Sequence, residues 1–167
     1  MNNKRQFEKD VTKKIDAWKK KFPTEKPESS IIMSLRFIQD HYGWLSDKHL
    51  DMLAEYLGIA PIRVYEVASF YSMYHRKPVG KHVLGICGSI SCMLRGSEPL
   101  IHHLENKLSI KLGETTEDGL FTLQEVECLA SCTKAPAMVV NGTQYVEDLT
   151  TKSLDQLIDD LRQGESL

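Results

Sequence analysis

Residues 85–96 read GICGSISCMLRG and place Cys87 and Cys92 five positions apart, directly after an apolar run. Residues 128–132 read CLASC and contain the remaining two cysteines of the chain, Cys128 and Cys132. Both pairs follow segments that are typical of strands, so we expect a rigid strand end to hold the first thiol of each pair. The two pairs therefore predict one site that is built from two loops.

The segments around these cysteines alternate between strand and helix patterns. Strand, helix, strand, hairpin and helix patterns follow one another at residues 82–86, 96–108, 121–127, 137–147 and 150–161. This order predicts a compact α/β domain, with helices on a mixed sheet and a thioredoxin-like outline, over residues 79–167. A thioredoxin-type catalyst would need a Cys-x-x-Cys pair, and neither cysteine pair has that spacing.

The chain before residue 79 has a helical rhythm instead. We expect Ser30 to cap a helix that ends at Gly43, and Ser46 to open a second helix that ends at Gly58. Pro61 occupies the first turn of a third helix. These short amphipathic segments predict a helical bundle domain over residues 1–78, with no chemistry of its own.

Two features of this N-terminal part have a structural interpretation. The first 21 residues, Lys4 and Arg5 included, are rich in basic side chains, and a solvated amphipathic helix is favoured over a docking arm. Residues 69–75, SFYSMYH, are interpreted as internal packing with a share of partner surface, rather than as a platform for stacking nucleic-acid bases. His41 and His49 are expected to be surface or hydrogen-bonded histidines.

Composition limits the classes of function. The chain has 167 residues, of which 41% are hydrophobic and 26% charged, and its net charge is -2. This balance gives no general case for nucleic-acid binding. No apolar run approaches the roughly 18–20 residues of a membrane span, and the N-terminus lacks the apolar region of a secretory signal. We therefore expect a cytoplasmic protein without direct membrane insertion, in a compartment that keeps thiols reduced.

Three kinds of structure could use the four thiols. A structural zinc ion also takes four cysteines, but its ligand pairs are usually spaced by two to four residues. Disulfides are disfavoured in a reducing compartment. An iron-sulfur cluster has two irons that each take a pair of thiolates, and its size tolerates the wider spacing of Cys87 and Cys92. Spacing and compartment favour the cluster and leave zinc and disulfides open.

Charge adds some support for a cluster. A 2Fe-2S cluster on four thiolates carries a charge of about -2 when oxidised and about -3 when reduced, so its site has to stabilise anions. Small residues let backbone amides approach the sulfurs, and here these are Gly88, Ser89, Ser91, Ser131 and Thr133. Glu125 and Glu127 precede Cys128, and a carboxylate facing the cluster would lower its reduction potential. An orientation toward solvent is equally compatible with the pattern.

Several motifs together carry a resemblance to a known family. The two cysteine pairs, VASFY at 67–71, LRG at 94–96 and AP at 135–136 occur in the order found in the E subunit of bacterial NADH-quinone oxidoreductase. The chain resembles that family, the counterpart of the small 2Fe-2S flavoprotein subunit of mitochondrial complex I, from about residue 28 to residue 160. The resemblance implies a helical bundle followed by a thioredoxin-like ferredoxin domain. It also implies one 2Fe-2S cluster with the metal ligands Cys87, Cys92, Cys128 and Cys132.

The resemblance implies an electron-transfer subunit rather than a complete enzyme. The chain has no glycine-rich nucleotide motif, so NADH and FMN would be bound by a partner subunit, and no residue is expected to act as a catalytic acid or base. A protein of this kind exchanges single electrons with the FMN and joins further subunits of the peripheral arm at the inner face of the bacterial membrane. Alternatives are the related subunit of an NAD-linked formate dehydrogenase or hydrogenase, a zinc-stabilised interaction module and a thiol-disulfide redox protein.

One residue departs from the family pattern. Glycine is common two positions after the third cysteine, where this chain has Ala130. A backbone that needs a positive φ at this position would be strained by alanine. We expect either slight strain or ordinary dihedral angles there, and retention of the cluster in both cases.

Overall fold

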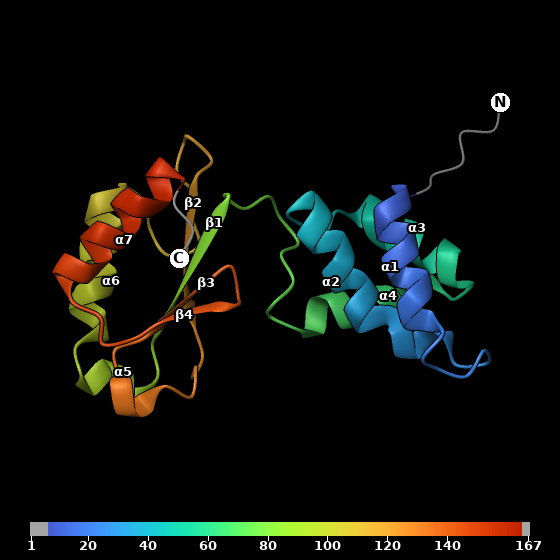
Figure 1. Ribbon diagram of the computed structural model, residues 1–167, viewed down its shortest axis with the longest axis horizontal. Coiled ribbons are helices and arrows are strands. Elements are labelled where there is room, and N and C mark those ends of the chain that lie inside the picture. The colour runs from blue at the N-terminus through green and yellow to red at the C-terminus, as the bar shows by residue number, and fades with distance from the viewer. Residues whose placement is uncertain (1–6, 165–167) are drawn as a thin grey trace. The chain divides into compact units, whose positions relative to one another are not determined.

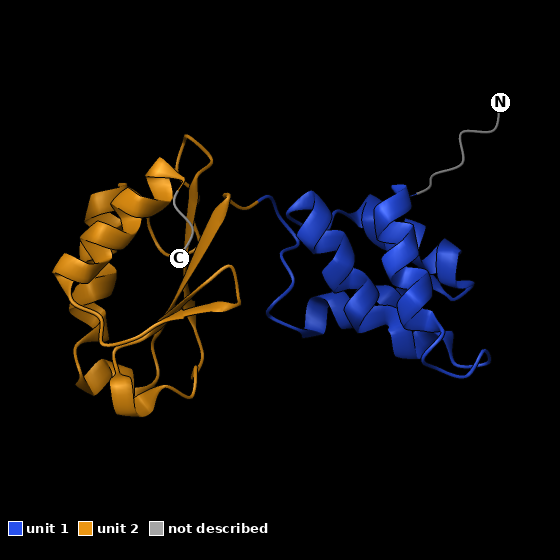
Figure 2. Cartoon of the chain, in the orientation of Figure 1, with its two compact units in different colours: residues 1–78 blue, residues 79–167 orange. Residues whose placement is uncertain are grey.

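The computed structural model describes residues 7–164. Within them the chain forms two compact units, of which the first ends at Pro78 and the second begins at Val79 (Figure 2). Each unit has its own hydrophobic core. Lys4 and Arg5 of the basic N-terminal segment lie outside the described residues.

In its described residues the first unit consists of helices joined by turns and loops, without strands (Figure 1). Its elements are the α-helices α1 (Lys9–Lys19), α2 (Ile31–Tyr42), α3 (Asp47–Leu57) and α4 (Pro61–Phe70), with the 3-10 helix η1 (Pro27–Ser30) between the first two. Val11 and Ile15 of α1 are buried in the core of this unit, while the lysines of the same helix remain on its other faces. The predicted amphipathic helix is therefore confirmed for the described residues.

The helix ends of this unit mostly follow the sequence signals. Ser46 accepts a hydrogen bond from the His49 N–H at 3.2 Å, and His49 Nδ1 accepts one from the Ser46 N–H, so this histidine serves as a helix cap. Gly58 ends α3 with a left-handed backbone, as predicted. The expected cap at Ser30 is wrong. Its hydroxyl donates instead to the Pro27 carbonyl at 2.7 Å, because Pro27 starts a 3-10 turn that leads directly into α2.

The aromatic segment at 69–75 is less buried than expected. Tyr74 is buried and its hydroxyl donates to the Ile32 carbonyl at 2.6 Å. Phe70, by contrast, is 79% exposed, and Tyr71 and Met73 are also exposed. The interpretation as internal packing holds for Tyr74 only, since α4 ends at Phe70 and the chain then makes a turn in which the Tyr74 N–H donates to the Tyr71 carbonyl at 3.2 Å.

The second unit is a four-stranded mixed sheet with two long helices on one face (Figure 1). Its strands are β1 (His82–Cys87), β2 (Phe121–Val126), β3 (Met138–Val140) and β4 (Gln144–Val146), and they lie in the order β2-β1-β3-β4. The pair β1–β2 is parallel, and the other two pairs are antiparallel. The helices α6 (Ser97–Leu108) and α7 (Thr151–Gln163) bury their leucines against this face.

A turn and a helix cap in this unit confirm two signals predicted from the sequence. Asn141 and Gly142 both have positive φ, at 53° and 69°, in the turn that joins β3 and β4. Thr150 caps α7 by accepting a hydrogen bond from the Ser153 N–H at 3.1 Å. A short helix, α5 (Ile90–Leu94), was not predicted and contains Cys92. The loop expected between the first two cysteines is therefore partly helical.

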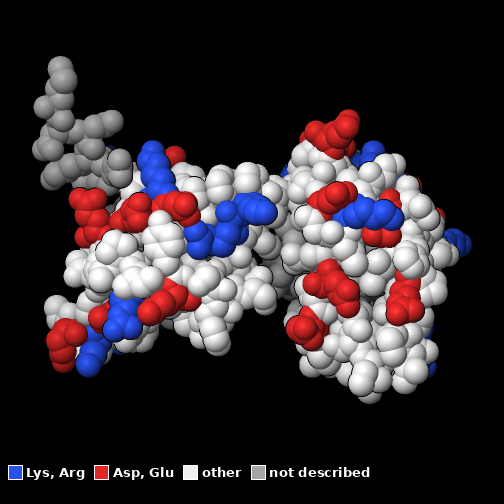
Figure 3. Space-filling view, turned by 180° about the vertical axis from the view of Figure 1, so that it is seen from behind, with Lys and Arg blue, Asp and Glu red and all other residues white. Residues whose placement is uncertain are grey.

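The surface of the described residues carries charged side chains of both signs. On the face of the molecule shown in Figure 3, basic and acidic side chains are interspersed rather than gathered into a basic stripe. Among residues 7–164, no helix combines the length and the apolar character that crossing a bilayer requires.

Candidate metal centre

The parallel pairing of β1 and β2 brings the two cysteine loops to one edge of the sheet. Cys87 is the last residue of β1 and lies opposite Val126, the last residue of β2. Because parallel strands point the same way, both chains leave the sheet at this edge. Cys128 follows β2 by two residues, and Cys132 begins the short 3-10 helix η2 (Cys132–Lys134). The long-range strand pairing therefore positions thiols that lie about forty residues apart in sequence.

The two cysteine pairs differ in burial. Cys87 and Cys92 are 2% and 3% exposed, and they form a small apolar cluster with Ala135 and the half-buried Leu129. Cys128 and Cys132 are exposed, and their sulfurs lie 3.9 Å apart. In the part of the chain that the structure describes, no three His, Cys, Asp or Glu side chains converge closely enough to hold a single metal ion.

Two interactions cross between the two loops and place parts of the second loop near the buried thiols of the first. The backbone N–H of Leu129, from the second loop, donates a hydrogen bond to the sulfur of Cys87 in the first. Cys132 lies close enough to Cys92 for its charge to raise the pKa of that thiol. The structure thus brings together all four cysteines that the sequence singled out.

The environments of the two buried thiols shift their pKa values in opposite directions. Burial opposes the thiolate of Cys87, but hydrogen bonds from the N–H groups of Leu129 and Ser89, the Cys92 thiol and the Ser89 hydroxyl outweigh it and lower its pKa. Burial raises the pKa of Cys92, and the hydrogen bond to Cys87 and the negative charges of Cys87 and Cys132 raise it further. The environment therefore favours a first negative charge on Cys87.

The hydrogen-bond donors around the sulfurs are mainly backbone amides. Besides the Leu129 and Ser89 amides on Cys87, the Ala137 N–H donates to Cys92, and the Ala130 N–H donates to Cys128 at 3.4 Å. Three sulfurs from two loops thus receive N–H groups, which stabilise negative charge on sulfur. This donor set fits an anionic iron-sulfur cluster. Sequence reasoning singles out Ser89 but misses the amides of Leu129, Ala130 and Ala137, which only the folded loops bring near the thiols.

Ala130 adopts the positive-φ backbone conformation that would normally favour glycine. Its φ is 60°, in the left-handed region, which costs an L-residue roughly 1–2 kcal/mol. The same conformation turns the Ala130 N–H toward the sulfur of Cys128. Of the two outcomes expected for this departure from the family pattern, the structure therefore shows the strained one.

The second loop is held by polar contacts next to Cys132. The Glu147 carboxylate, which follows β4, accepts hydrogen bonds from the Ser131 hydroxyl at 2.7 Å and from Lys134 Nζ at 2.9 Å. These two contacts lower the pKa of Glu147, with the Ser131 hydrogen bond as the larger cause. The loop that carries the exposed pair is thus attached to the end of the β-hairpin.

An apolar surface lies beside the buried pair. It consists of Ile90, Met93 and Leu94 on α5, the helix that contains Cys92. Ile90 is 71% exposed and Leu94 is 77% exposed. We call these three residues the α5 surface. Sequence reasoning misses it, because a segment this short shows no helical period from which an exposed face could be predicted.

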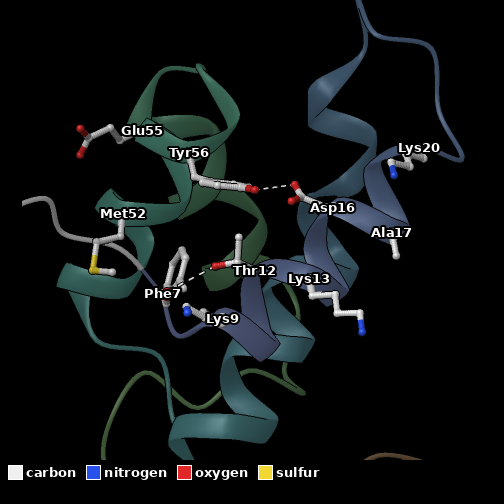
Figure 4. A pocket seen from close by; sticks show the side chains of 10 residues that line it. All are labelled: Phe7, Lys9, Thr12, Lys13, Asp16, Ala17, Lys20, Met52, Glu55 and Tyr56. Atoms are coloured by element: carbon white, nitrogen blue, oxygen red, sulfur yellow. Dashed lines mark hydrogen bonds between the residues drawn. The ribbon is translucent and has the colours of Figure 1, made fainter.

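The other candidate features are separate from the thiols. A hollow of about 850 Å³ lies between α1 and α3 of the first unit, where the Tyr56 hydroxyl donates to Asp16 (Figure 4). His41 lies 3.3 Å from the Glu8 carboxylate, and His103 Nε2 lies 2.8 Å from Asp155. Both histidines therefore have polar partners, which for His41 agrees with the expectation from the sequence.

The fold and the placement of the thiols together define a thioredoxin-like α/β protein whose two cysteine pairs lie at one edge of the sheet, without the Cys-x-x-Cys pair of a dithiol catalyst. Comparison with known sequences extends this class to a family. The chain belongs to the thioredoxin-like 2Fe-2S ferredoxin family, whose pattern it matches over residues 15–162.

Relatives from two bacteria match most of the chain. It is 41% identical over 155 residues to the E 2 subunit of the NADH-quinone oxidoreductase of Rhizobium meliloti, a match that covers 93% of this chain and 90% of that relative. It is 42% identical over 147 residues to NADH-quinone oxidoreductase subunit 2 of Thermus thermophilus, covering 88% and 81% of the two chains.

A similar fold occurs in a solved structure of a different oxidoreductase. The crystal structure of an NAD+-reducing NiFe hydrogenase in its H2-reduced state contains a region that matches 80% of this chain with a TM-score of 0.70. The matched region is 22% of the hydrogenase chain, and the sequence identity is 21%. This likeness shows the fold alone.

Proposed function

We propose that this protein is the electron-transfer subunit of an NADH-quinone oxidoreductase. In this proposal Cys87, Cys92, Cys128 and Cys132 hold one 2Fe-2S cluster, which supplies reversible one-electron transfer when bound. The observation that supports the proposal is the placement of both cysteine pairs at one sheet edge, with backbone N–H groups from both loops next to their sulfurs. The names of the relatives support the assignment to this complex.

The chain's own residues would then position and tune the cofactor. Burial of Cys87 and Cys92 excludes water from one side of the site, while the exposed Cys128 and Cys132 leave the other side open to a redox partner. The amides of Leu129, Ser89 and Ala137 would stabilise the negative charge of the cluster. No side chain is required to move a proton. A helical bundle over residues 1–78 and a cluster domain over residues 79–167 are part of the same proposal.

The partner in this proposal is a subunit that binds NADH and FMN, together with further subunits of the peripheral arm. FMN accepts a hydride as two electrons, and a one-electron carrier is needed to exchange electrons with it singly. The α5 surface supports docking beside the thiols, because Ile90, Met93 and Leu94 expose the apolar side chains typical of interface cores. Attachment to the inner face of the bacterial membrane would follow from assembly into the complex.

Chemical analysis of the purified protein tests the cofactor. After anaerobic purification we expect about two iron atoms and two acid-labile sulfides per chain, with visible absorption that dithionite bleaches. Reduced protein should give the electron paramagnetic resonance signal of a one-electron-reduced cluster. A colourless protein with one zinc ion per chain would reject the proposal in favour of a zinc-stabilised module.

Co-purification tests the partner and the complex. Leu94→Glu should reduce recovery of the flavin-containing subunit without changing the iron content, because it places a charge on the α5 surface. Lys152→Glu, a change of charge on the exposed side of α7, is the matched control and should leave recovery unchanged. Quinone reduction by the recovered membrane fraction supports the respiratory complex. Oxidation of formate or hydrogen by a soluble assembly would instead assign the subunit to an NAD-linked formate dehydrogenase or hydrogenase. The similar fold found in a hydrogenase is compatible with this second function.

A further inference from the structure

One acidic side chain of β2 reaches the first cysteine loop. Glu125 lies opposite Ile86 in the parallel register of β1 and β2, one residue before Cys87. Its carboxylate occupies the space beside Gly88, the residue directly after Cys87. A methyl group added to Gly88 would lie 2.8 Å from Glu125 Cγ and nearer still to the carboxylate, so the Glu125 side chain would have to move aside to make room for it.

The backbone conformation at position 88 does not itself require glycine, whereas the space beside it is taken up by the Glu125 side chain. The φ of Gly88 lies outside the left-handed region, so alanine could adopt the same conformation. The Gly88 N–H donates to the Val126 carbonyl at 3.1 Å, which fixes the start of the loop against the end of β2. The missing Cβ therefore leaves room for a carboxylate at a defined place beside the thiol site.

The charge of Glu125 is uncompensated within residues 7–164. No Lys, Arg or His nitrogen in this range forms an ion pair with it. The Glu147 carboxylate, beside the other loop, is instead paired with Lys134. Of these two carboxylates, Glu125 is therefore the one without an ion-pair partner in this range.

We infer that Glu125, whose carboxylate lies beside Gly88, lowers the reduction potential of the cluster. The inference rests on the proposed function and adds to it the residue that sets the potential. Reduction adds one electron to the cluster, with no bond made or broken in the protein, and a fixed negative charge nearby disfavours that addition by Coulomb repulsion. Because Glu125 is exposed, dissolved ions screen part of this repulsion.

The main test is the midpoint potential of the cluster-loaded protein, followed by electron paramagnetic resonance during titration with dithionite. Glu125→Gln keeps the size of the side chain and removes its charge. We expect reduction to become about tenfold more favourable, which is a shift of about 59 mV to more positive potential for one electron. The shift should shrink as the salt concentration is raised, which a purely structural effect of the substitution would not do.

Two further glutamates serve as matched controls. Glu117→Gln makes the same change at an exposed site in the turn before β2, at the opposite end of that strand, and should leave the midpoint unchanged. Glu127→Gln makes it next to Cys128 and should give a smaller shift than Glu125→Gln, since among residues 7–164 it is the Glu125 carboxylate that lies beside a glycine of a cysteine loop. An equal shift in the Glu127 and Glu125 variants would overturn the inference.

Gly88→Ala supplies an independent test, because its methyl group displaces the carboxylate without removing it. We expect a positive shift in the wild-type background and a much smaller one when Glu125 is already glutamine. Equal shifts in the two backgrounds would mean that the methyl group acts on the cluster directly, and would count against the inference. An unchanged midpoint in Glu125→Gln protein with normal iron content refutes this inference alone, whereas wild-type protein without iron refutes the proposed function.

Discussion

The first cysteine pair is held by burial and the second by polar contacts at the surface. Cys87 and Cys92 lie at a strand end and in a helix, where Ala135 and Leu129 cover them. Cys128 and Cys132 lie in an exposed loop that includes a strained alanine. This difference indicates that one half of the site is fixed by the core of the domain, while the other half depends on a few hydrogen bonds and a local backbone conformation.

The largest effect expected from this contrast concerns the thiols themselves. Both Cys92→Ser and Cys132→Ser should prevent cluster binding, since each removes a proposed ligand. In the metal-free protein the two should differ. A buried serine hydroxyl at position 92 costs about 1–3 kcal/mol if it finds no partner, whereas an exposed serine at position 132 changes stability by less than about 0.5 kcal/mol.

Iron analysis and urea unfolding of the metal-free variants measure these two quantities. Equal losses of stability in the two variants would contradict the difference in burial between the pairs.

A smaller effect is expected from relieving the strain in the second loop. Ala130→Gly removes a left-handed penalty of roughly 1–2 kcal/mol, partly offset by about 0.4–1 kcal/mol from the greater freedom of glycine in the unfolded chain. We therefore expect a net stabilisation of about 0.5–1 kcal/mol, measured by urea unfolding. The converse control is Gly113→Ala, at φ 86° with open space around the added methyl, which should destabilise the domain. A loss of stability in Ala130→Gly would show that the loop relaxes around alanine.

The smallest effect is a pH dependence confined to the second loop. The pKa of Glu147 is lowered from its ordinary value of 4.5 by the Ser131 hydroxyl and Lys134. Its contribution to stability is therefore fully present above pH 4.5 and is lost as the pH falls through the lower pKa of the folded state. Hydrogen exchange in metal-free protein should show the amide of Lys134 losing protection over this range before that of Cys87. In Glu147→Gln protein the pH-dependent step should disappear, and its persistence would assign the step to another group.

The sequence predicted most of the fold because its long segments have clear periodicity and clear ends. The apolar runs of β1 and β2, the Asn141-Gly142 turn and the cap at Thr150 are local signals, and local contacts form them. The helix α5 was missed because five residues are too few for periodicity to distinguish a helix from a loop. The cap at Ser30 was wrong because Pro27, three residues earlier, starts a competing turn.

The site was predictable in its thiols and not in its surroundings. Because each cysteine pair directly follows a predicted strand, the sequence alone was enough to predict that the four thiols belong to one site. The amides of Leu129 and Ala137 could not be assigned to sulfurs, because they reach Cys87 and Cys92 only through pairing between distant segments. Glu125 and Glu127 looked equivalent in the sequence, and only the space beside Gly88 distinguishes Glu125.

The parallel register of β1 and β2 has a consequence for how this chain can vary in length. Successive residues of a strand point to opposite faces, so inserting one residue within β1 or β2 would rotate the following thiol to the wrong side of the sheet. The connection between α6 and β2, at residues 109–120, lies outside both strands. Additional residues at its exposed turn, residues 117–119, would leave the ends of β1 and β2 aligned, so insertions are tolerable there and not within the two strands that deliver the cysteines.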